Sequence, residues 1–304
     1  MCGFITSCIC KSARPVDDVH GPVAGLTNKH VSAHTNSQNR HGNHEDYVEP
    51  EVTAARKELL HEQLQAGIDK IKHRGPDGSD IWINSEGTVG LAHCRLSIND
   101  LSPSGMQPLH SDDGLIHAVV NGEIYDFDRL RKECIEQHGY TFTGQSDSEL
   151  VIALYKIHGA PKFLQFLRGE FAFVLFDERK ESRRVIAGRD RFGIKPLLWT
   201  VVDDRVLFAA EAKAFLPMGW TPEWDVHSIS DSGWMMDDRT VFKGVRKLMP
   251  GHWMQVTDER GIEIRGYWDA EYPDKASLSH TVPDTLRQYS YHPRPSLRLG
   301  QSRR

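Results

Sequence analysis

Short apolar segments with the character of β-strands lie on both sides of two helical segments, and this arrangement constrains the fold of the 304-residue chain most strongly. The first strand-like stretch is residues 1–10, and further segments follow at 81–83, 89–98, 115–120, 171–177, 184–187, 197–202 and 205–209. One helix is expected to begin near Asp126. The other is expected at Ser146, with Glu149 three residues on at capping-box spacing. Strands grouped at both ends with helices between them predict an α+β fold with two sheets enclosed by helices.

Composition divides the chain into stretches that differ in their capacity to fold. Residues 1–10 and 52–220 are expected to form the core, and residues 221–272, with aromatic and Gly/Pro punctuation, a C-terminal extension of it. Residues 11–51 read as a low-complexity insertion with almost no large apolar side chains, which cannot bury enough surface to offset the entropy of ordering. Residues 273–304 are rich in Ser, Pro, Arg and Gln and are expected to be a disordered tail.

A further helix is expected at the start of the second core stretch. Apolar residues recur there at helical spacing on a charged background, namely Leu60, Leu64, Ile68 and Ile71. The pattern stops at Gly75-Pro76, which is a turn by composition.

Charge and cysteine usage exclude several classes of function. A formal net charge of −5 without basic clusters gives no electrostatic footprint for nucleic acid. No window approaches the ~18 to 20 apolar residues that a membrane span needs. The five cysteines are an odd number without metal-ligand spacing, and no secretory signal precedes them. The sequence therefore favours reduced thiols in the cytoplasm, with no metal site, no nucleic acid and no membrane as partners.

Cys2 is chemically informative because its neighbour is the initiator Met1. A small second residue permits removal of Met1, which leaves Cys2 with both a thiol and a free α-amine. An unperturbed α-amine has a pKa of about 7.7 to 8, so it can take the thiol proton near neutral pH without a histidine. The alternative is a small apolar residue in a first strand, and this alternative is favoured if Cys2 is considered alone.

Three other positions carry groups that such a nucleophile needs. Arg95, at the end of a strand, could hold a carboxylate in a bidentate manner, or it could be an ordinary ion-paired arginine. Asn121 and Gly122 offer an amide and a backbone N–H for an oxyanion hole, although Asn-Gly is also a strong hairpin signal. Asp147 could hold an ammonium group or serve the helix start.

Six segments together resemble the glutamine-hydrolysing asparagine synthetases, in the order seen in that family. They are MCG at 1–3, HRGPD at 73–77, HCRLSI at 93–98, NGEIY at 121–125, SD at 146–147 and GRDRFGIKPL at 188–197. The resemblance covers residues 1–10 and about 52–272, and it is to the family's N-terminal, class II glutamine amidotransferase domain. It implies an N-terminal nucleophile hydrolase fold, an αββα sandwich of two antiparallel sheets between helix layers.

The resemblance also implies roles for matching residues. Cys2 would be the nucleophile, with its own amine as base, and Asn121 and Gly122 would form the oxyanion hole. The substrate L-glutamine would be bound by five residues, which are Arg95 for the α-carboxylate, Glu123 and Asp147 for the α-ammonium, and Leu96 and Ile98 through the backbone. The expected reaction is hydrolysis of glutamine to glutamate and ammonia through a thioester, without a cofactor.

One part of the family pattern is absent from the sequence. The Ser-Gly-Gly-x-Asp-Ser loop, by which the family's synthetase domain uses ATP and Mg, does not occur, so asparagine synthesis by this chain alone is not expected. Three functions stay open. The chain could be an active glutaminase, which releases ammonia itself or supplies it to a separate synthetase chain, and it could act as a homodimer. It could also be a non-catalytic, regulatory remnant. The third alternative is an amidotransferase that serves another acceptor.

Overall fold

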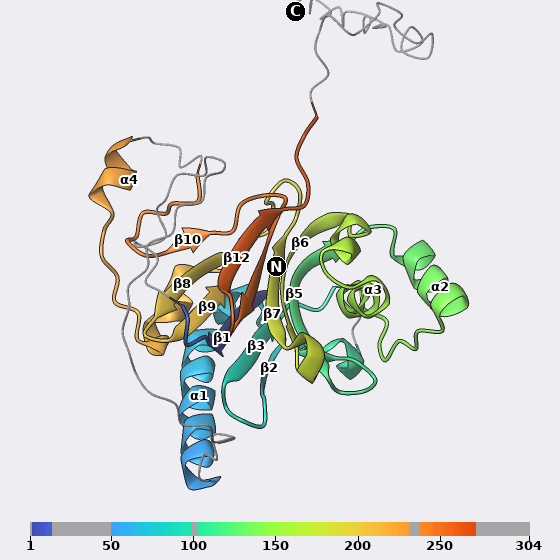
Figure 1. Cartoon of the computed structure of the whole chain (residues 1–304), viewed down its shortest axis with the longest axis horizontal. Helices are drawn as coiled ribbons and strands as arrows, with labels where there is room; N and C mark the ends of the chain where they lie inside the picture. Colours follow the sequence, from blue (N-terminus) through green and yellow to red (C-terminus); the bar gives the residue numbers. More distant parts are fainter. Residues whose placement is uncertain (1, 14–49, 99–101, 232–236, 272–304) are drawn as a thin grey trace, which may run out of the picture. The chain divides into compact units, whose positions relative to one another are not determined.

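The computed structural model describes residues 2–13, 50–98, 102–231 and 237–271 (Figure 1). The expected insertion at 11–51 and tail at 273–304 lie outside the described residues, except for 11–13 and 50–51. The described chain up to Asp269 forms one compact unit, and it contains two six-stranded sheets in which every pairing is antiparallel.

The first sheet has the N-terminal strand near its middle. Its order is β10 (Arg246–Lys247), β8 (Leu198–Val202), β9 (Arg205–Ala209), β1 (Gly3–Ile9), β3 (Val89–Arg95) and β2 (Gly78–Ile83). Because β1 is paired on both sides, with β9 and with β3, the residue before it is held by an element that cannot shift easily.

The second sheet carries the longest strands. Its order is β12 (Gly261–Gly266), β11 (His252–Thr257), β7 (Arg184–Arg189), β6 (Gly169–Asp177), β5 (Ile116–Ile124) and β4 (Leu109–His110). Strands from residues 221–272 therefore belong to both sheets: β10 closes an edge of the first, while β11 and β12 extend the second. This stretch completes the sheets as well as extending the chain.

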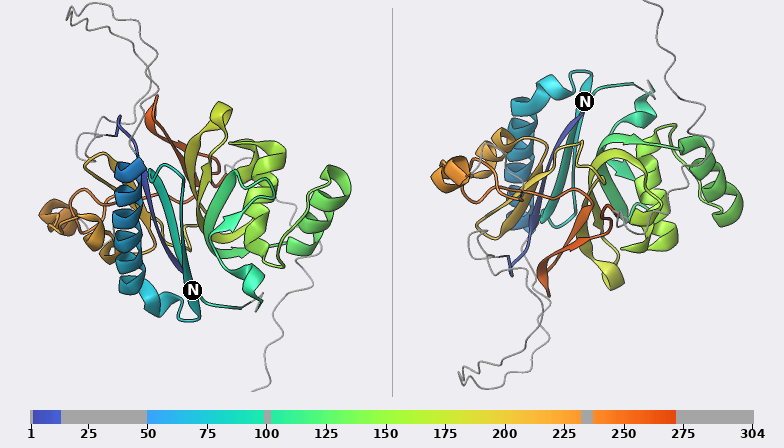
Figure 2. Two further views of the ribbon diagram at one scale, coloured as in Figure 1. Left: turned by 90° about the horizontal axis from the view of Figure 1, so that it is seen from below. Right: turned by 90° about the horizontal axis from the view of Figure 1, so that it is seen from above.

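Helices cover the two outer faces, as Figure 2 shows from below and above. The helix α1 (Pro50–Ile71) lies on the first sheet, while α2 (Phe127–His138) and α3 (Leu150–His158) lie on the side of the second sheet; the short α4 (Val226–Asp231) follows later in the chain. The four layers are therefore helix, sheet, sheet, helix. This arrangement confirms the predicted α+β sandwich of two antiparallel sheets.

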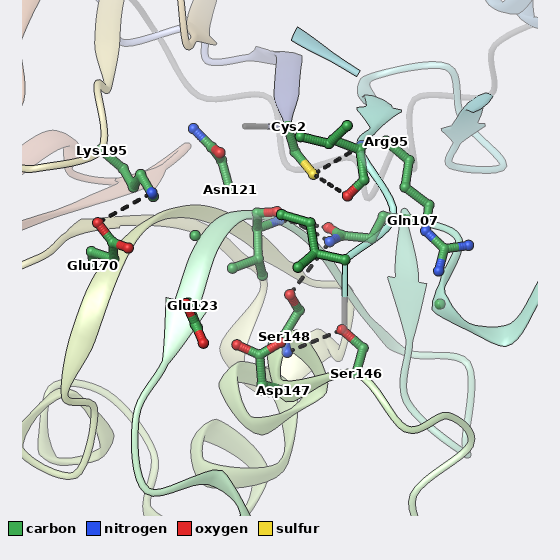
Figure 3. A pocket seen from close by; sticks show the side chains of 15 residues that line it. Cys2, Arg95, Gln107, Asn121, Glu123, Ser146, Asp147, Ser148, Glu170 and Lys195 are labelled. Carbon is green, nitrogen blue, oxygen red and sulfur yellow. Dashed lines mark hydrogen bonds and ion pairs between the residues drawn. The ribbon is translucent and has the colours of Figure 1, made fainter. Parts of the chain in front are cut away.

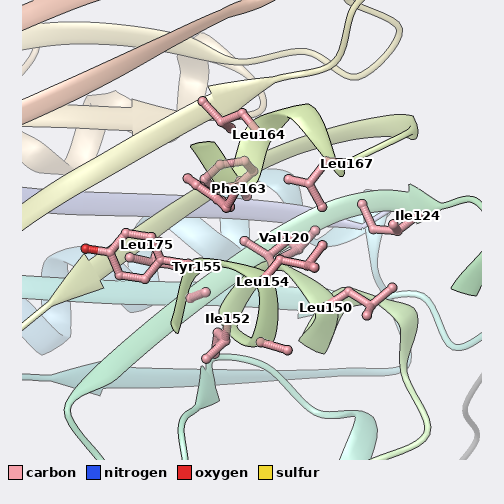
Figure 4. Close-up of a cluster of buried hydrophobic side chains, with 14 of the residues drawn as sticks. Val120, Ile124, Leu150, Ile152, Leu154, Tyr155, Phe163, Leu164, Leu167 and Leu175 are labelled. Atoms are coloured by element: carbon pink, nitrogen blue, oxygen red, sulfur yellow. The ribbon is translucent and has the colours of Figure 1, made fainter. Parts of the chain in front are cut away.

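Side-chain alternation explains why the layers form. On β1, Ile5 points to α1 and contacts the apolar stripe of that helix, whereas Phe4 and Cys8 point to the layer between the sheets. The predicted stripe is buried, with Leu64 and Ile68 fully inaccessible. Burial of such a side chain contributes about 1.5 to 3 kcal/mol to folding. On the other side, residues of α3, including Leu150 and Leu154, share one core cluster with Val120 of β5 (Figure 4).

Two local expectations differ from the structure. The helix α3 begins at Leu150, after a 3-10 turn over Asp147–Glu149 in which the Ser146 hydroxyl accepts from the Ser148 N–H. The Glu149 carboxylate does not close the expected capping box; it accepts from the backbone N–H groups of Thr143 and Gly144. The prediction of a capping box was wrong because the preceding loop offers Glu149 two N–H donors at hydrogen-bond distance, which satisfy its carboxylate.

Candidate functional site

All eight residues predicted for the site line one pocket between the two sheets (Figure 3). They are Cys2, Arg95, Leu96, Ile98, Asn121, Gly122, Glu123 and Asp147. They come from the start of β1, the end of β3 and the loop after it, the end of β5, and the turn before α3. Pairing across the sheets thus joins segments that are far apart in sequence.

Cys2 directly precedes the central strand β1 and is partly exposed to the pocket. Its Sγ lies 3.3 Å from the Leu96 backbone N, which donates to it, and 3.6 Å from the Leu96 carbonyl oxygen. The Arg74 Nε donates to the Cys2 carbonyl at 3.1 Å, and the same guanidinium pairs with Glu211 at 3.0 Å. Cys2 is therefore held through its backbone by the 73–77 motif and through its thiol by the 93–98 motif.

Asn121 and Gly122 lie within β5 and not in a hairpin turn. They pair with Ala172 and Phe171 of β6, and this excludes the turn alternative left open by Asn-Gly. The Asn121 side chain is fully buried, and neither of its amide atoms has a hydrogen-bond partner in the part of the chain that the structure describes. An unsatisfied buried amide is costly, so this group is suited to a polar ligand atom in the pocket.

Arg95 ends β3 with its side chain largely buried, and its Nη1 donates to the Ser102 carbonyl at 2.8 Å. The following loop is tied back by the Ser97 N–H, which donates to Asp77 at 2.7 Å. Ile98 is highly exposed on the wall of the pocket. The guanidinium is thus positioned by the backbone near the pocket, where it can meet a carboxylate.

Asp147 is tied to the strand that carries Asn121. Its Oδ2 accepts from the Ile124 backbone N at 2.6 Å. Glu123, between Gly122 and Ile124, also lines the pocket and is exposed. Two carboxylates thus stand on the wall opposite the guanidinium of Arg95, an arrangement that suits a zwitterionic amino acid (Figure 3).

Five further polar residues, for which the motifs predict no catalytic or substrate-binding role, also line the pocket: Gln107, Ser146, Ser148, Glu170 and Lys195. Lys195 pairs with Glu170 at 3.3 Å. Lys195 belongs to the 188–197 segment, so the resemblance includes this residue, but it does not predict the ion pair with Glu170. Gln107 belongs to none of the six segments, and no local signal points to it.

Within the residues that the structure describes, no helix has both the length and the apolar character needed to cross a membrane. Likewise, no group of three or more His, Cys, Asp or Glu side chains in the described ranges is arranged to hold a metal ion. The five cysteines are all free thiols, and Cys2 alone is more than marginally exposed.

Comparison with known proteins identifies the class to which this fold and pocket belong. Residues 51–268 match the glutamine amidotransferase domain, and the chain belongs to that family. Amidase chry2 of Gibberella zeae is 50% identical over 227 residues, which cover 75% of this chain and 33% of that protein. Asparagine synthetase B of Escherichia coli is 41% identical over 221 residues, which cover 72% of this chain and 34% of that protein. The family expected from the six segments is thereby confirmed.

A solved structure supports the fold independently. The glutamine phosphoribosylpyrophosphate amidotransferase of Bacillus subtilis, complexed with ADP and GMP, superposes with a TM-score of 0.56, covering 88% of this chain and 50% of that one. The sequence identity is 17%, so this likeness concerns the fold alone. The chain spans about a third of the length of the curated relatives it matches.

Proposed function

We propose that this chain hydrolyses L-glutamine to glutamate and ammonia, with Cys2 as the nucleophile. The observation that carries the proposal is the unpartnered amide of the buried Asn121 in the same pocket as the Cys2 thiol. An oxyanion hole needs donors that are preorganised and not already used by the protein. Arg95, Leu96, Ile98, Glu123 and Asp147 supply the matching groups for a glutamine backbone.

The steps follow from the groups in the pocket. Removal of Met1 frees the α-amine of Cys2, which takes the proton of the thiol. The thiolate attacks the side-chain carboxamide carbon, and the oxygen of the tetrahedral intermediate is held by the Asn121 amide and the Gly122 N–H. The C–N bond then breaks, and the α-ammonium of Cys2 gives its proton to the departing amide nitrogen, which leaves as ammonia. Water hydrolyses the resulting γ-glutamyl thioester and regenerates the thiol, so the cycle uses no cofactor.

The acceptor of the ammonia is a separate question. One candidate is aspartate, through a synthetase chain or domain that uses ATP and Mg, as the asparagine synthetases suggest by name. The second candidate is another acceptor, favoured because identity to the two amidases, 50% and 48%, exceeds that to these asparagine synthetases, 34% and 41%. We place the reaction in the cytoplasm, where the thiols stay reduced.

The decisive experiment measures glutamate release from glutamine by the purified protein, with the absence of Met1 verified by mass spectrometry. Cys2→Ala is expected to lower kcat by about 10³-fold or more, because the covalent step is lost. Cys134→Ala, which removes a buried thiol of α2 that is not among the residues lining the pocket, is the matched control and should retain kcat.

Two outcomes would contradict the proposal. A correctly processed wild type without turnover would favour the regulatory, non-catalytic alternative. Equal turnover by wild type and Cys2→Ala would exclude Cys2 as nucleophile. Supplying aspartate or other acceptors, ATP and a separate synthetase chain, with the amide products analysed by mass spectrometry, distinguishes the two acceptor hypotheses.

A further inference from the structure

We infer that Gln107 is a positioning residue for the oxyanion hole, and that its side-chain amide takes the place of a missing strand at the edge of β5. The expected effect on kinetics rests on the proposed function, whereas the role of Gln107 in holding the edge of β5 does not depend on it. Gln107 is nearly fully buried and lies in the wall of the pocket (Figure 3).

The two edges of β5 are paired very differently. On one side, β6 pairs with β5 from Ile116 to Ile124. On the other side, β4 pairs with only two residues, Ala118 opposite Leu109 and His117 opposite His110. Beyond Ala118 the β4 side of β5 has no neighbouring strand among the described residues, although this is the part that carries Asn121 and Gly122.

Backbone groups alternate between these two edges. The Glu178 N–H donates to the Leu115 carbonyl and the Tyr125 N–H to the Arg168 carbonyl, so odd-numbered residues of β5 face β6. The Ser111 N–H donates to the Ile116 carbonyl, so even-numbered residues face β4. By this alternation the N–H groups of Val120, Gly122 and Ile124 all point to the edge that β4 leaves open.

Gln107 closes that edge at Val120. The Val120 N–H donates to the Gln107 Oε1 at 2.7 Å, and the Gln107 Nε2 donates to the Val120 carbonyl at 3.1 Å. The register of β4 puts Gln107 opposite Val120, where a longer β4 would have made these two bonds through its backbone. The side-chain amide has the same donor and acceptor as a peptide group, so it continues the ladder beyond Pro108.

A second polar side chain holds the same edge at Ile124, whose N–H donates to the Asp147 carboxylate at 2.6 Å. Gly122 lies midway between these two anchored residues. By the alternation along β5 its N–H points to the open edge and away from β6, and Gly122 lines the pocket, so this N–H is available to a ligand there. The Gln107 Nε2 also lies 3.5 Å from Ser148 Oγ, next to Asp147. Gln107 and Asp147 together therefore hold the direction of the Gly122 N–H.

Loss of this positioning by Gln107 is expected to affect mainly the transition state of the attack. Donors of an oxyanion hole act on the charge that develops during attack, and loss of one donor typically lowers kcat by about 10²- to 10³-fold. Removing a positioning residue displaces the donor without deleting it, so the effect should be smaller. Because the hydrogen bond from the Gly122 N–H is expected to strengthen as charge develops on the oxygen during attack, the loss should fall on kcat, and KM should change little.

Three variants test the inference by glutamate release. Gln107→Leu keeps the volume but loses both bonds, and kcat is expected to fall about 10- to 100-fold with KM within twofold. Gln107→Glu keeps an acceptor for the Val120 N–H but, when ionised, puts an oxygen against the Val120 carbonyl. Gln137→Leu, an exposed residue of α2, is the matched control and should leave kcat unchanged.

The pH profile of Gln107→Glu separates positioning from general structural damage. A protonated carboxylic acid has one donor and one acceptor, as the amide does, and burial favours this neutral form. The ratio of kcat for Gln107→Glu to kcat for wild type should therefore rise as the pH falls from 8 to 5.5. A flat ratio, or a Gln107→Leu variant within twofold of the wild-type kcat, would overturn the inference.

Amide hydrogen exchange tests the structural role of Gln107 independently of whether the chain hydrolyses glutamine. If the wild type does not turn over glutamine, the proposed function fails, and exchange at Val120 decides the structural part. Faster exchange of the Val120 amide in Gln107→Leu than in wild type supports a clamp at this edge. Equal exchange in both proteins would overturn it.

Discussion

At the scale of single residues, two glycines allow β5 and β6 to approach each other beside the pocket. Gly122 has φ +148° and Gly169 has φ +145°, conformations that residues with a Cβ rarely adopt. A Cβ on Gly122 would lie 2.0 Å from the Glu170 carbonyl oxygen, and one on Gly169 would lie 2.1 Å from the Glu123 carbonyl oxygen. Each glycine therefore allows a close backbone contact as well as an unusual φ.

Gly122→Ala is expected to destabilise the fold strongly, because the added methyl meets backbone atoms that cannot rotate away. Strain and overpacking together should lower the free energy of unfolding by about 3 kcal/mol or more. Gly114→Ala is the matched control: its φ is +66°, but a Cβ there meets nothing within 4 Å, so a loss of about 1 kcal/mol is expected. Urea denaturation measures both, and equal losses would contradict the steric argument.

Sequence alone singled out the candidate site residues that line the pocket, but not the residues that hold them in place. Cys2, Arg95 and Asn121 carry distinctive chemistry in motifs that can be read locally. Gln107 is a common residue whose role exists only because the register of β4 brings it opposite Val120, thirteen positions along the chain. The Asn-Gly pair was ambiguous for the same reason: pairing with β6 over the whole length of β5, which is a non-local interaction, overrides the local turn preference.

At the scale of elements, the loop after β7 depends on one buried carboxylate. Asp190 is fully buried, and its oxygens accept from four backbone N–H groups, those of Phe171, Phe192, Ile194 and Lys195, at 3.0 to 3.2 Å. The first is on β6 and the others are in the loop. This carboxylate fixes the loop against the sheet and brings Lys195 to the pocket, where it meets Glu170.

Asp190→Asn should weaken this loop, because an amide NH₂ replaces an oxygen that accepts two of the four bonds. Loss of two charge-assisted hydrogen bonds predicts a decrease of about 3 kcal/mol in the free energy of unfolding. Asp203→Asn is the control, since Asp203 is exposed with φ +54°, a region that Asn tolerates. Its expected effect is within about 0.5 kcal/mol. Chemical denaturation that shows similar losses for the two variants would argue against the anchoring role.

The elements themselves were predicted unevenly. The helix α1 and most strands were found because apolar spacing is a local property of the sequence, and burial of Leu64 and Ile68 follows from it. The start of α3 was placed too early, since the 3-10 turn at Asp147–Glu149 depends on where the Glu149 carboxylate finds donors. The pairing order of the two sheets depends on contacts between distant strands, which no local pattern contains.

At the scale of the whole molecule, the layer between the sheets contains histidines that are neutral in the folded state. His93 is fully buried and lies on the same side of β3 as Leu91, which packs between the sheets. Burial lowers the pKa of His93 to about 3. Burial, and then the neighbouring His110, lowers the pKa of His117 to about 4.

This burial predicts acid sensitivity. An unfolded histidine titrates near pH 6.5, so below that pH the unfolded state binds more protons than the folded state. The contribution of these two histidines to the free energy of unfolding is therefore highest above about pH 6.5 and falls toward pH 3. For His93 alone the expected loss between pH 7 and pH 5 is about 2 kcal/mol. Urea denaturation at both pH values measures it.

A variant without His93 isolates the contribution of this histidine to the loss of stability in acid. His93→Gln removes the titrating group, so its loss of stability between pH 7 and pH 5 should be smaller than that of wild type, whatever its absolute stability. His61→Gln, at an exposed position of α1, should keep the wild-type loss. An acid loss in His93→Gln that equals the wild-type loss would show that His93 does not contribute.

The distribution of the five thiols between surface and interior has a practical consequence. Cys8, Cys10, Cys94 and Cys134 are at most 1% exposed, whereas Cys2 opens to the pocket. A thiol-modifying reagent therefore finds one target in the native protein and five after denaturation. Labelling stoichiometry alone can thus measure the folded fraction of a preparation, and a dye or crosslinker can be attached in the pocket without any engineered cysteine.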